Sequence, residues 1–276
     1  MKRILVPCDF SLTALQAFKF ASEIARVGKG EVFLLHIVEV PTLHNSLFSP
    51  VRAYENAFLK SLKEKATKNF EKMKDKWSKK VRVQLFVVQG SVISTINRYV
   101  DRKRIDLVVM GTHGSSGLRE YAVGSNTEKM VRTAKVPVIA VRKAPKTASF
   151  KDLIFPTILD ANQKKLVASV KALQKFFKAK LHILYVNTPA NFSRDVLTGN
   201  RLDEFAHRNR FKNYTVNIFN DQDEQDGIIH FTSQYKSKLI AMATHARKGL
   251  GHLLGGSIAE DVVNHIDCPI WTCAEK

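Results

Sequence analysis

The chain contains an internal repeat, and this repeat constrains the fold more than any single motif. Four pairs of short segments match in the same order, the first two at an offset of 149 residues and the last two at an offset of 132. The pairs are Lys2–Pro7 with Lys151–Pro156, Val32–Ile37 with Leu181–Val186, Asp106–His113 with Lys238–His245, and Val136–Val141 with Cys268–Cys273. Two copies of one unit therefore account for the 276 residues.

Each copy alternates short apolar strands with amphipathic helices. In the first copy we expect strands at residues 4–6, 31–38, 82–88, 107–110 and 138–141, and helices at 13–27, 60–80, 91–102 and 126–134. Near-continuous apolar strands that alternate with helices predict a parallel sheet covered on both faces. The sequence thus predicts an α/β fold with one domain at 1–143, a linker at 144–150 and a second domain at 151–276.

The composition excludes several classes of protein. An apolar fraction of 45% and a charged fraction of 25% exclude a disordered or collagen-like chain. No run reaches the roughly 18 apolar residues of a membrane helix. The first apolar run stops at Asp9, too early for a secretory signal, so we expect a cytoplasmic protein without a membrane partner.

The three cysteines do not predict a disulfide framework or a metal site. Their number is odd, and the chain is long enough to bury a core of its own. His265, Cys268 and Cys273 lie close in sequence, but strand alternation would put the two cysteines on opposite faces. We therefore expect buried thiols and no metal.

The net charge of +19 is the most unusual number in the composition. Nine lysines fall between residues 60 and 80, on a helix with an apolar stripe at Leu59, Leu62, Ala66, Phe70 and Met73. We interpret the lysines as a solvated helix face. Binding of nucleic acid is not expected, because no helix-turn-helix, zinc-finger or RNP pattern is present. An acidic partner stays open.

The loop 111–126 is the richest candidate for chemistry. It contains four glycines and leads into a helix, whose first N–H groups attract anions. Such a loop forms a phosphate cradle. The alternative is a helix start alone, because Ser125–Glu128 and Ser257–Glu260 both fit the capping-box pattern. The sequence contains neither a Walker A loop nor a G-x-G-x-x-G motif after the first strand.

These residues resemble the universal stress protein family. The spacing Gly111-x2-Gly114-x9-Gly124-Ser125 fits that family's G-2x-G-9x-G-(S/T) nucleotide motif, and Ile4–Ser11 looks like its first strand and aspartate. The resemblance covers essentially the whole chain. It implies two tandem five-stranded parallel-sheet α/β sandwich domains of the Rossmann-like, nucleotide-binding kind. Members commonly pair through their last strands, so the two domains would pair within the chain, and a homodimer is a further option.

The resemblance also implies a site for ATP or another adenine nucleotide, with or without Mg²⁺, in the first domain. Asp9 would face the ribose and Ile37 the adenine, and the glycine loop would surround the phosphates. The residues assigned to the site are Pro7, Cys8, Asp9, Ile37, Met110, Gly111, His113, Gly114, Gly124, Ser125 and Asn126. A turn or cap role for Asp9 stays open from the sequence alone.

The second domain departs from this pattern. Ile158 stands in place of Asp9, and Ala243 and Ala246 stand in place of Gly111 and Gly114. If those glycines need a positive φ, each alanine costs about 1 kcal/mol. Only Gly256 and Ser257 remain as a possible second site.

We therefore expect the second domain to bind nucleotide poorly and to act as a pseudo-partner. The chain as a whole is predicted to be a stress-response regulator that binds a nucleotide without turnover. A slow ATPase is the alternative, with His113, Arg119 and Glu120 near the loop. None of their spacings requires catalysis, so no catalytic residue is assigned.

Overall fold

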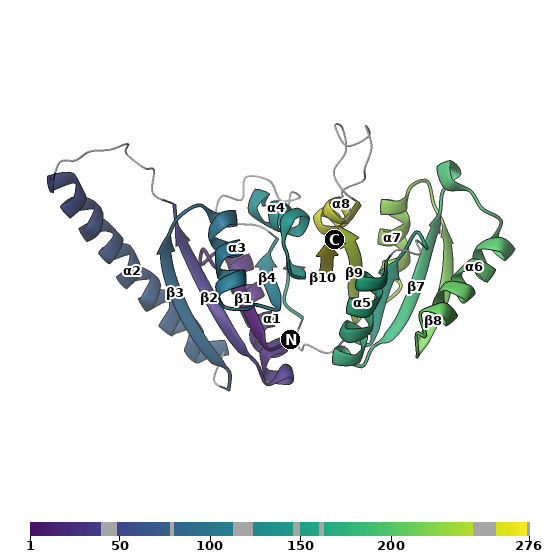
Figure 1. The fold of residues 1–276 in the computed structure, drawn as a ribbon, viewed down its shortest axis with the longest axis horizontal. Helices are drawn as coiled ribbons and strands as arrows, with labels where there is room; N and C mark the ends of the chain where they lie inside the picture. Colours follow the sequence, from purple (N-terminus) through teal and green to yellow (C-terminus); the bar gives the residue numbers. More distant parts are fainter. Residues whose placement is uncertain are drawn as a thin grey trace.

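Ten strands form a single sheet in this computed structural model, which describes residues 1–39, 49–77, 80–112, 124–145, 150–159, 163–244 and 258–274. The strand order is β3-β2-β1-β4-β5-β10-β9-β6-β7-β8 (Figure 1). Neighbouring strands run parallel everywhere except between β5 and β10. The predicted α/β fold is therefore confirmed, with both five-stranded sets continuous in one sheet.

The elements repeat in the same order in two halves, which we call the first half (β1–β5, α1–α4) and the second half (β6–β10, α5–α8). The strands are β1 Arg3–Pro7, β2 Glu31–Val38, β3 Arg82–Gln89, β4 Leu107–Gly111, β5 Val138–Val141, β6 Asp152–Pro156, β7 Lys180–Asn187, β8 Tyr214–Asn220, β9 Lys238–Thr244 and β10 Ile270–Ala274. The helices are α1 Leu12–Gly28, α2 Ser49–Trp77, α3 Val92–Arg102, α4 Ser125–Thr133, α5 Lys164–Phe177, α6 Asp195–Arg208, α7 Glu224–Ser233 and α8 Ile258–His265, with a 3₁₀ turn η1 at Pro189–Asn191.

Two helical layers cover the sheet, because its strands are apolar on both faces. In β1, for example, Ile4 and Val6 pack on one face and Leu5 packs on the other. Helices α1, α2, α5 and α6 contribute to the cluster on the first face. Helices α3 and α4 in the first half, and α7 and α8 in the second, cover the opposite face. This is the two-sided burial that the sequence predicted.

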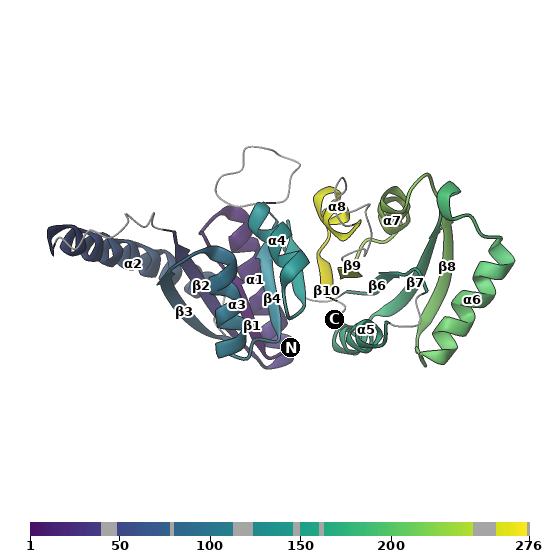
Figure 2. The same ribbon diagram turned by 45° about the horizontal axis from the view of Figure 1, so that its top comes forward.

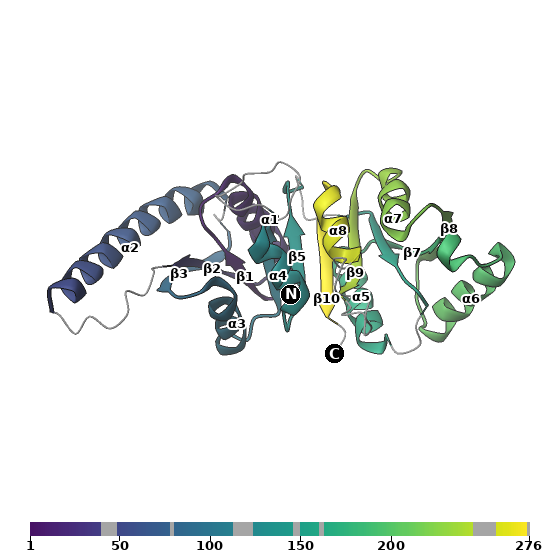
Figure 3. The same ribbon diagram turned by 90° about the horizontal axis from the view of Figure 1, so that it is seen from above.

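The two halves meet at β5 and β10, which lie side by side in the middle of the molecule (Figure 3). In this antiparallel ladder Ile139 pairs with the buried Trp271. Close to the ladder, the ring of Phe150 lies 5.9 Å from Phe20 of α1 and 4.9 Å from Phe177 of α5, measured between centroids. The apolar core on this face therefore continues through both halves.

Two sequence predictions about element bounds were wrong. The last strand was expected at Cys268–Cys273, but β10 begins at Ile270, after Pro269. Proline has no N–H group to donate to a ladder, so a strand readily begins beyond it. Cys268 therefore lies outside the strand, and both Cys268 and Cys273 are only half-buried rather than buried. Helix α2 is also longer than predicted, because it begins at Ser49.

The two edges of the sheet differ. Helix α2 packs against the edge strand β3 near its carboxyl end and extends beyond the sheet at its amino end (Figure 2). Helix α6 lies over the opposite edge strand, β8. Within the described ranges, no helix is long and apolar enough to cross a membrane.

Candidate functional site

A cavity of about 150 Å³ lies at the carboxyl ends of β1, β2 and β4. Ligands bind at this edge in open α/β sheets. Nine of the eleven predicted site residues line it: Pro7, Cys8, Asp9, Ile37, Met110, Gly111, Gly124, Ser125 and Asn126. The other two, His113 and Gly114, lie outside the described residues. The structure thus brings four separate stretches of sequence around one cavity.

A tight turn after β1 carries Asp9 into the cavity. The Asp9 Oδ1 atom accepts a hydrogen bond from the Ser11 N–H at 3.0 Å, and the Ser11 hydroxyl caps α1 by accepting from the Ala14 N–H. Phe10 adopts φ = 64°, in the left-handed region that a non-glycine residue seldom occupies. Asp9 therefore has the turn role that the sequence left open, and it also lines the cavity.

His36 on β2 fixes the same turn from the side. Its Nδ1 atom lies 2.8 Å from the carbonyl oxygen of Cys8, and its ring centroid lies 4.9 Å from that of Phe10. Strain of this kind costs on the order of 1–3 kcal/mol, so surrounding contacts must hold it. We infer that His36 supplies part of that support.

Cys8 is buried and forms part of the cavity wall. Its N–H donates to the carbonyl oxygen of Leu35 at 2.9 Å, and its side chain is 5% exposed. Burial, which disfavours the thiolate, raises the pKa of Cys8 to about 12. The thiol is therefore protonated at neutral pH.

Gly111 is required by space and not by its backbone angles. Among the described glycines only Gly90 has a positive φ, so the positive φ considered for Gly111 is absent. A Cβ atom on Gly111 would lie 2.6 Å from the carbonyl carbon of Thr13 at the start of α1. Glycine therefore allows α1 to approach the end of β4 closely.

Helix α4 presents its amino end to the cavity. Its N-cap is Gly124, and Ser125 is the first residue within the helix, so Ser125 is not the capping residue that the S-x-x-E pattern suggested. The Thr127 hydroxyl donates to the carbonyl oxygen of Gly111 at 2.7 Å and joins the helix to β4. The first-turn N–H groups of Ser125 and Asn126 have no carbonyl partner within the helix. This end of α4 therefore favours an anion.

The remaining walls are mostly apolar, and sequence reasoning did not find all of them. The additional lining residues are Ala14, Leu35, Val92 and Thr127. Leu35 could have been found from strand alternation, because it lies two residues from Ile37 and so on the same face of β2. Val92 and Ala14 lie at helix starts, where only the assembled fold shows which ends converge.

The comparisons with known proteins identify the family. The sequence model of the universal stress protein family matches residues 1–142 and 150–273. The chain belongs to the universal stress protein family. Universal stress protein MJ0531 of Methanocaldococcus jannaschii is 30% identical over 145 residues, which cover 52% of this chain and 84% of that protein. Universal stress protein MJ0577 of the same organism is 29% identical over 154 residues, covering 51% of this chain and 95% of that protein.

A solved structure shares the fold of the whole chain. The crystal structure of a universal stress protein from Archaeoglobus fulgidus superposes with a TM-score of 0.74, over 99% of this chain and 98% of that chain. The two sequences are 17% identical, so this likeness concerns the fold alone. The double universal stress protein fold therefore extends over the full length.

The second half of this universal stress protein repeats the backbone of the turn. The Thr157 N–H donates to the carbonyl oxygen of Leu184 at 2.9 Å, as the Cys8 N–H does to that of Leu35. Leu159 has φ = 63°, which matches the left-handed residue of the first turn. The two copies therefore keep the same turn geometry.

The side chains of the second turn differ from those of the first. Ile158 replaces the carboxylate of the first turn and is exposed. Glu224 begins α7, whereas Val92 begins the equivalent α3. The Glu224 Oε1 atom accepts a hydrogen bond from the Asn191 side chain at 2.9 Å. The position that is apolar Val92 in the first site is thus the charged residue Glu224 in the second half.

The end of β9 accommodates a methyl group where β4 has glycine. Ala243 packs against the core of the second half. Gly256 and Ser257, with Ala246, lie outside the described residues.

Proposed function

We propose that this protein is a stress-response regulator whose first half binds ATP or another adenine nucleotide. The observation that carries this proposal is the convergence of nine predicted residues on one cavity at the carboxyl edge of the sheet. The family resemblance selected those residues from four separate segments, at residues 7–9, 37, 110–111 and 124–126. A helix start with no ligand role would not require them to meet.

The chemistry of the cavity suits the parts of a nucleotide. Its volume of about 150 Å³ is below the roughly 300–1,000 Å³ of pockets that enclose a whole ligand. We therefore expect it to hold the base and part of the ribose between Ile37, Val92 and Met110. Asp9 would accept hydrogen bonds from ribose hydroxyls. The phosphates would extend along the amino end of α4.

A magnesium ion would be bound through the phosphates. No group of three or more metal-ligating side chains occurs in the part of the chain that the structure describes. Magnesium commonly keeps several waters and binds through substrate phosphates. The chain would then supply the nucleotide site, and the phosphates and water would supply the ligands of the magnesium ion.

The second half would act as a pseudo-partner. Ile158 offers no acceptor for a ribose hydroxyl, and Glu224 would place a negative charge where the first site is apolar. Burial of a carboxylate against an aromatic base costs free energy, because the charge loses water. We therefore propose one nucleotide per chain.

Calorimetric titration of the full chain with ATP tests this proposal. We expect one site per chain, and Asp9→Asn should weaken ATP about 10-fold, or about 1.4 kcal/mol. Asparagine keeps an oxygen that can accept from the Ser11 N–H, so the turn is retained. The matched control is Ile158→Asn at the equivalent turn, which should leave ATP affinity unchanged. Two sites per chain, or no binding by nucleotide-free protein, would contradict the proposal.

A further inference from the structure

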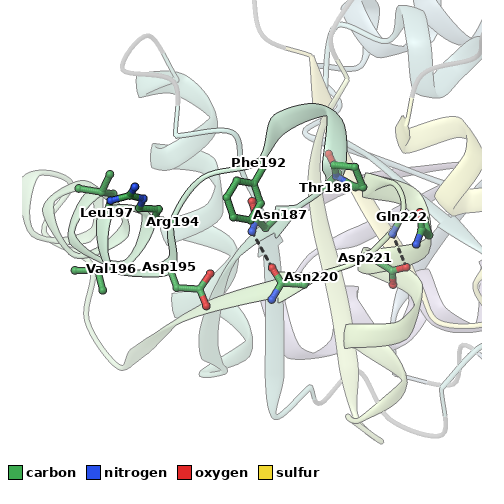
Figure 4. A pocket seen from close by; sticks show the side chains of 11 residues that line it. Asn187, Thr188, Phe192, Arg194, Asp195, Val196, Leu197, Asn220, Asp221 and Gln222 are labelled. Carbon is green, nitrogen blue, oxygen red and sulfur yellow. Dashed lines mark hydrogen bonds between the residues drawn. The ribbon is translucent and has the colours of Figure 1, made fainter.

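A wide groove lies at the far end of the second half, distinct from the nucleotide cavity. We call it the α6 groove, and it is lined by Asn187, Phe192, Val196, Leu197, Asn220 and Asp221 among others. It lies between the carboxyl ends of β7 and β8 and the start of α6, and its volume is about 1060 Å³ (Figure 4). A surface hollow of this size is large enough to receive a segment of another protein.

Three large apolar side chains line the α6 groove. Phe192 is 73% exposed, Val196 76% and Leu197 56%. Of the seven large apolar side chains exposed among the described residues, these three fall within six positions. Exposed apolar side chains gathered in this way mark an interaction site.

The polar groups at the base of the α6 groove bond to one another. The Asn187 Nδ2 atom donates to Asn220 Oδ1 at 2.8 Å, and Asn187 Oδ1 accepts from the Ser193 N–H at 2.9 Å. They therefore do not call for a small polar ligand. The groove instead suits an occupant with apolar side chains.

Arg194 and Asp195 at the start of α6 contribute one charge of each sign to the α6 groove. The rim beside the end of β8 is acidic, in contrast to the rest of the chain. Residues 221–226 contain four carboxylates and no basic residue, within a protein of net charge +19. A hydrogen bond from His230 at 2.7 Å lowers the pKa of Asp221. The occupant should therefore carry positive charge next to its apolar side chains.

Helix α2 has both properties. Between residues 57 and 74 it carries six exposed lysines and two glutamates. Its apolar stripe steps by four residues from Phe58 to Leu62, Ala66 and Phe70. Ala66 and Phe70 are buried, Leu62 is half-buried, and Phe58 is 44% exposed. At 3.6 residues per turn, Phe58 lies about 40° around the helix from Leu62 and about 120° from Phe70, so it adjoins the packed stripe and stays exposed. The amino end of α2 extends beyond the sheet (Figure 3).

We propose that the projecting part of α2 from one molecule docks in the α6 groove of a second copy of this chain. Phe58 and Leu62 would contact Phe192, Val196 and Leu197, with the α2 lysines near the acidic rim. Helix α2 and the α6 groove lie at opposite ends of the sheet, beside β3 and β8 (Figure 1). The contact is therefore head to tail, and repetition of it builds open chains of molecules.

Such a contact is small and depends on salt. A single helix end in an open groove buries less than the roughly 1,200 Å² of stable interfaces, which suits a transient association. Exposed charge pairs are screened at high ionic strength. We expect self-association in the micromolar range that weakens several-fold between about 0.05 and 0.5 M NaCl.

Sedimentation velocity of the nuclease-treated full chain tests the proposal. The wild type should form species that grow with concentration up to about 200 μM. Phe58→Asp on α2 and Leu197→Lys in the groove should each weaken association at least 10-fold. Val27→Asp and Val27→Lys are matched controls, since Val27 is 47% exposed on α1 and should leave association unchanged. Circular dichroism shows whether each variant folds.

Mixing the two variants tests the pairing of α2 with the groove, and growth of the wild type beyond a dimer distinguishes open chains from a two-fold symmetric pair. A 1:1 mixture of Phe58→Asp and Leu197→Lys keeps one intact α2 and one intact groove, so it should form a 1:1 dimer and nothing larger. A wild type that stays monomeric, a loss of association on nuclease treatment, or a mixture that does not associate would each overturn the proposal. So would association that Leu197→Lys leaves unchanged.

Discussion

At the scale of single residues, the nucleotide cavity depends on close contacts that a sequence motif does not express. The motif gave the position of Gly111, but the reason for glycine is the approach of Thr13 from α1, at a distance that only the fold determines. Likewise, the sequence left Asp9 with two possible roles, in a turn or in ligand binding. In the structure Asp9 accepts the hydrogen bond of the turn and also lines the cavity. The spacing of residues in the sequence therefore identified residues of the site, but it did not give the physical reason for each of them.

The Gly111→Ala substitution should destabilise the protein by about 1–3 kcal/mol, because its methyl group would overlap the backbone of α1. Gly199→Ala is a suitable control, since a Cβ atom there meets nothing within 4 Å and the residue lies inside α6. The control should be neutral or stabilising by up to about 1 kcal/mol. Urea unfolding measures both, and equal effects would show that space at Gly111 is not limiting.

Burial of Cys8 should make stability fall at alkaline pH. Its pKa is raised from 9.0 to about 12, so the folded state holds the proton more tightly than the unfolded state. This contribution is complete below pH 9 and is lost as the pH rises towards 12. The loss of stability between pH 9 and pH 10 amounts to about 1 kcal/mol.

Urea unfolding at pH 8, 9 and 10 checks this dependence on Cys8. Cys8→Ala should lose about 1 kcal/mol less than the wild type between pH 9 and pH 10. Parallel pH profiles for Cys8→Ala and the wild type would mean that Cys8 ionises at an ordinary pH in the folded protein.

At the scale of elements, hydrophobic periodicity predicted the bounds of a strand where the buried apolar run lies within that strand. The predicted bounds of β2 and β5 equal the observed ones, because all of β5 and the centre of β2, from Val32 to Leu35, are buried apolar runs. The prediction was less accurate where apolar residues extend past the element, as at Cys268 before β10. It also missed the first turns of α2, which begins at Ser49.

The uneven burial of α2 predicts different effects of substitutions at its two ends. Phe70→Ala should cost about 3–5 kcal/mol, because Phe70 is buried against the core. Phe58→Ala should change stability by less than about 0.5 kcal/mol, since Phe58 lies on the projecting part. Thermal or urea unfolding at about 1 μM protein, where self-association is negligible, compares the two. Similar losses for both variants would mean that the whole helix is packed in solution.

At the scale of the whole molecule, the repeat predicted two copies, but it could not predict how far they share one core. The apolar cluster that runs from α1 through Phe150 to α5 depends on the meeting of β5 and β10, which are more than a hundred residues apart. Pairwise contacts over such a separation leave no periodic signal in the sequence. The linker at 144–150 stays a prediction from composition, but Phe150 at its end is buried and packs against Phe20 of α1 and Phe177 of α5.

This shared junction predicts the behaviour of the first half alone. A chain of residues 1–143 would expose the edge of β5, whose four residues are all buried in the full protein. Unpaired edges of this kind recruit another strand. We therefore expect the 1–143 chain to dimerise through β5 at micromolar concentration.

Ala140→Lys in the 1–143 chain supplies the control. Ala140 belongs to the apolar cluster whose other buried members come from the second half, so we expect a lysine there to disturb the core of the first half little. Its charge at the exposed edge should prevent pairing and leave a folded monomer. Light scattering after gel filtration separates the outcomes. If the unsubstituted 1–143 chain is a monomer, then the pairing of β5 with β10 is a consequence of the packing of the two halves and not its cause.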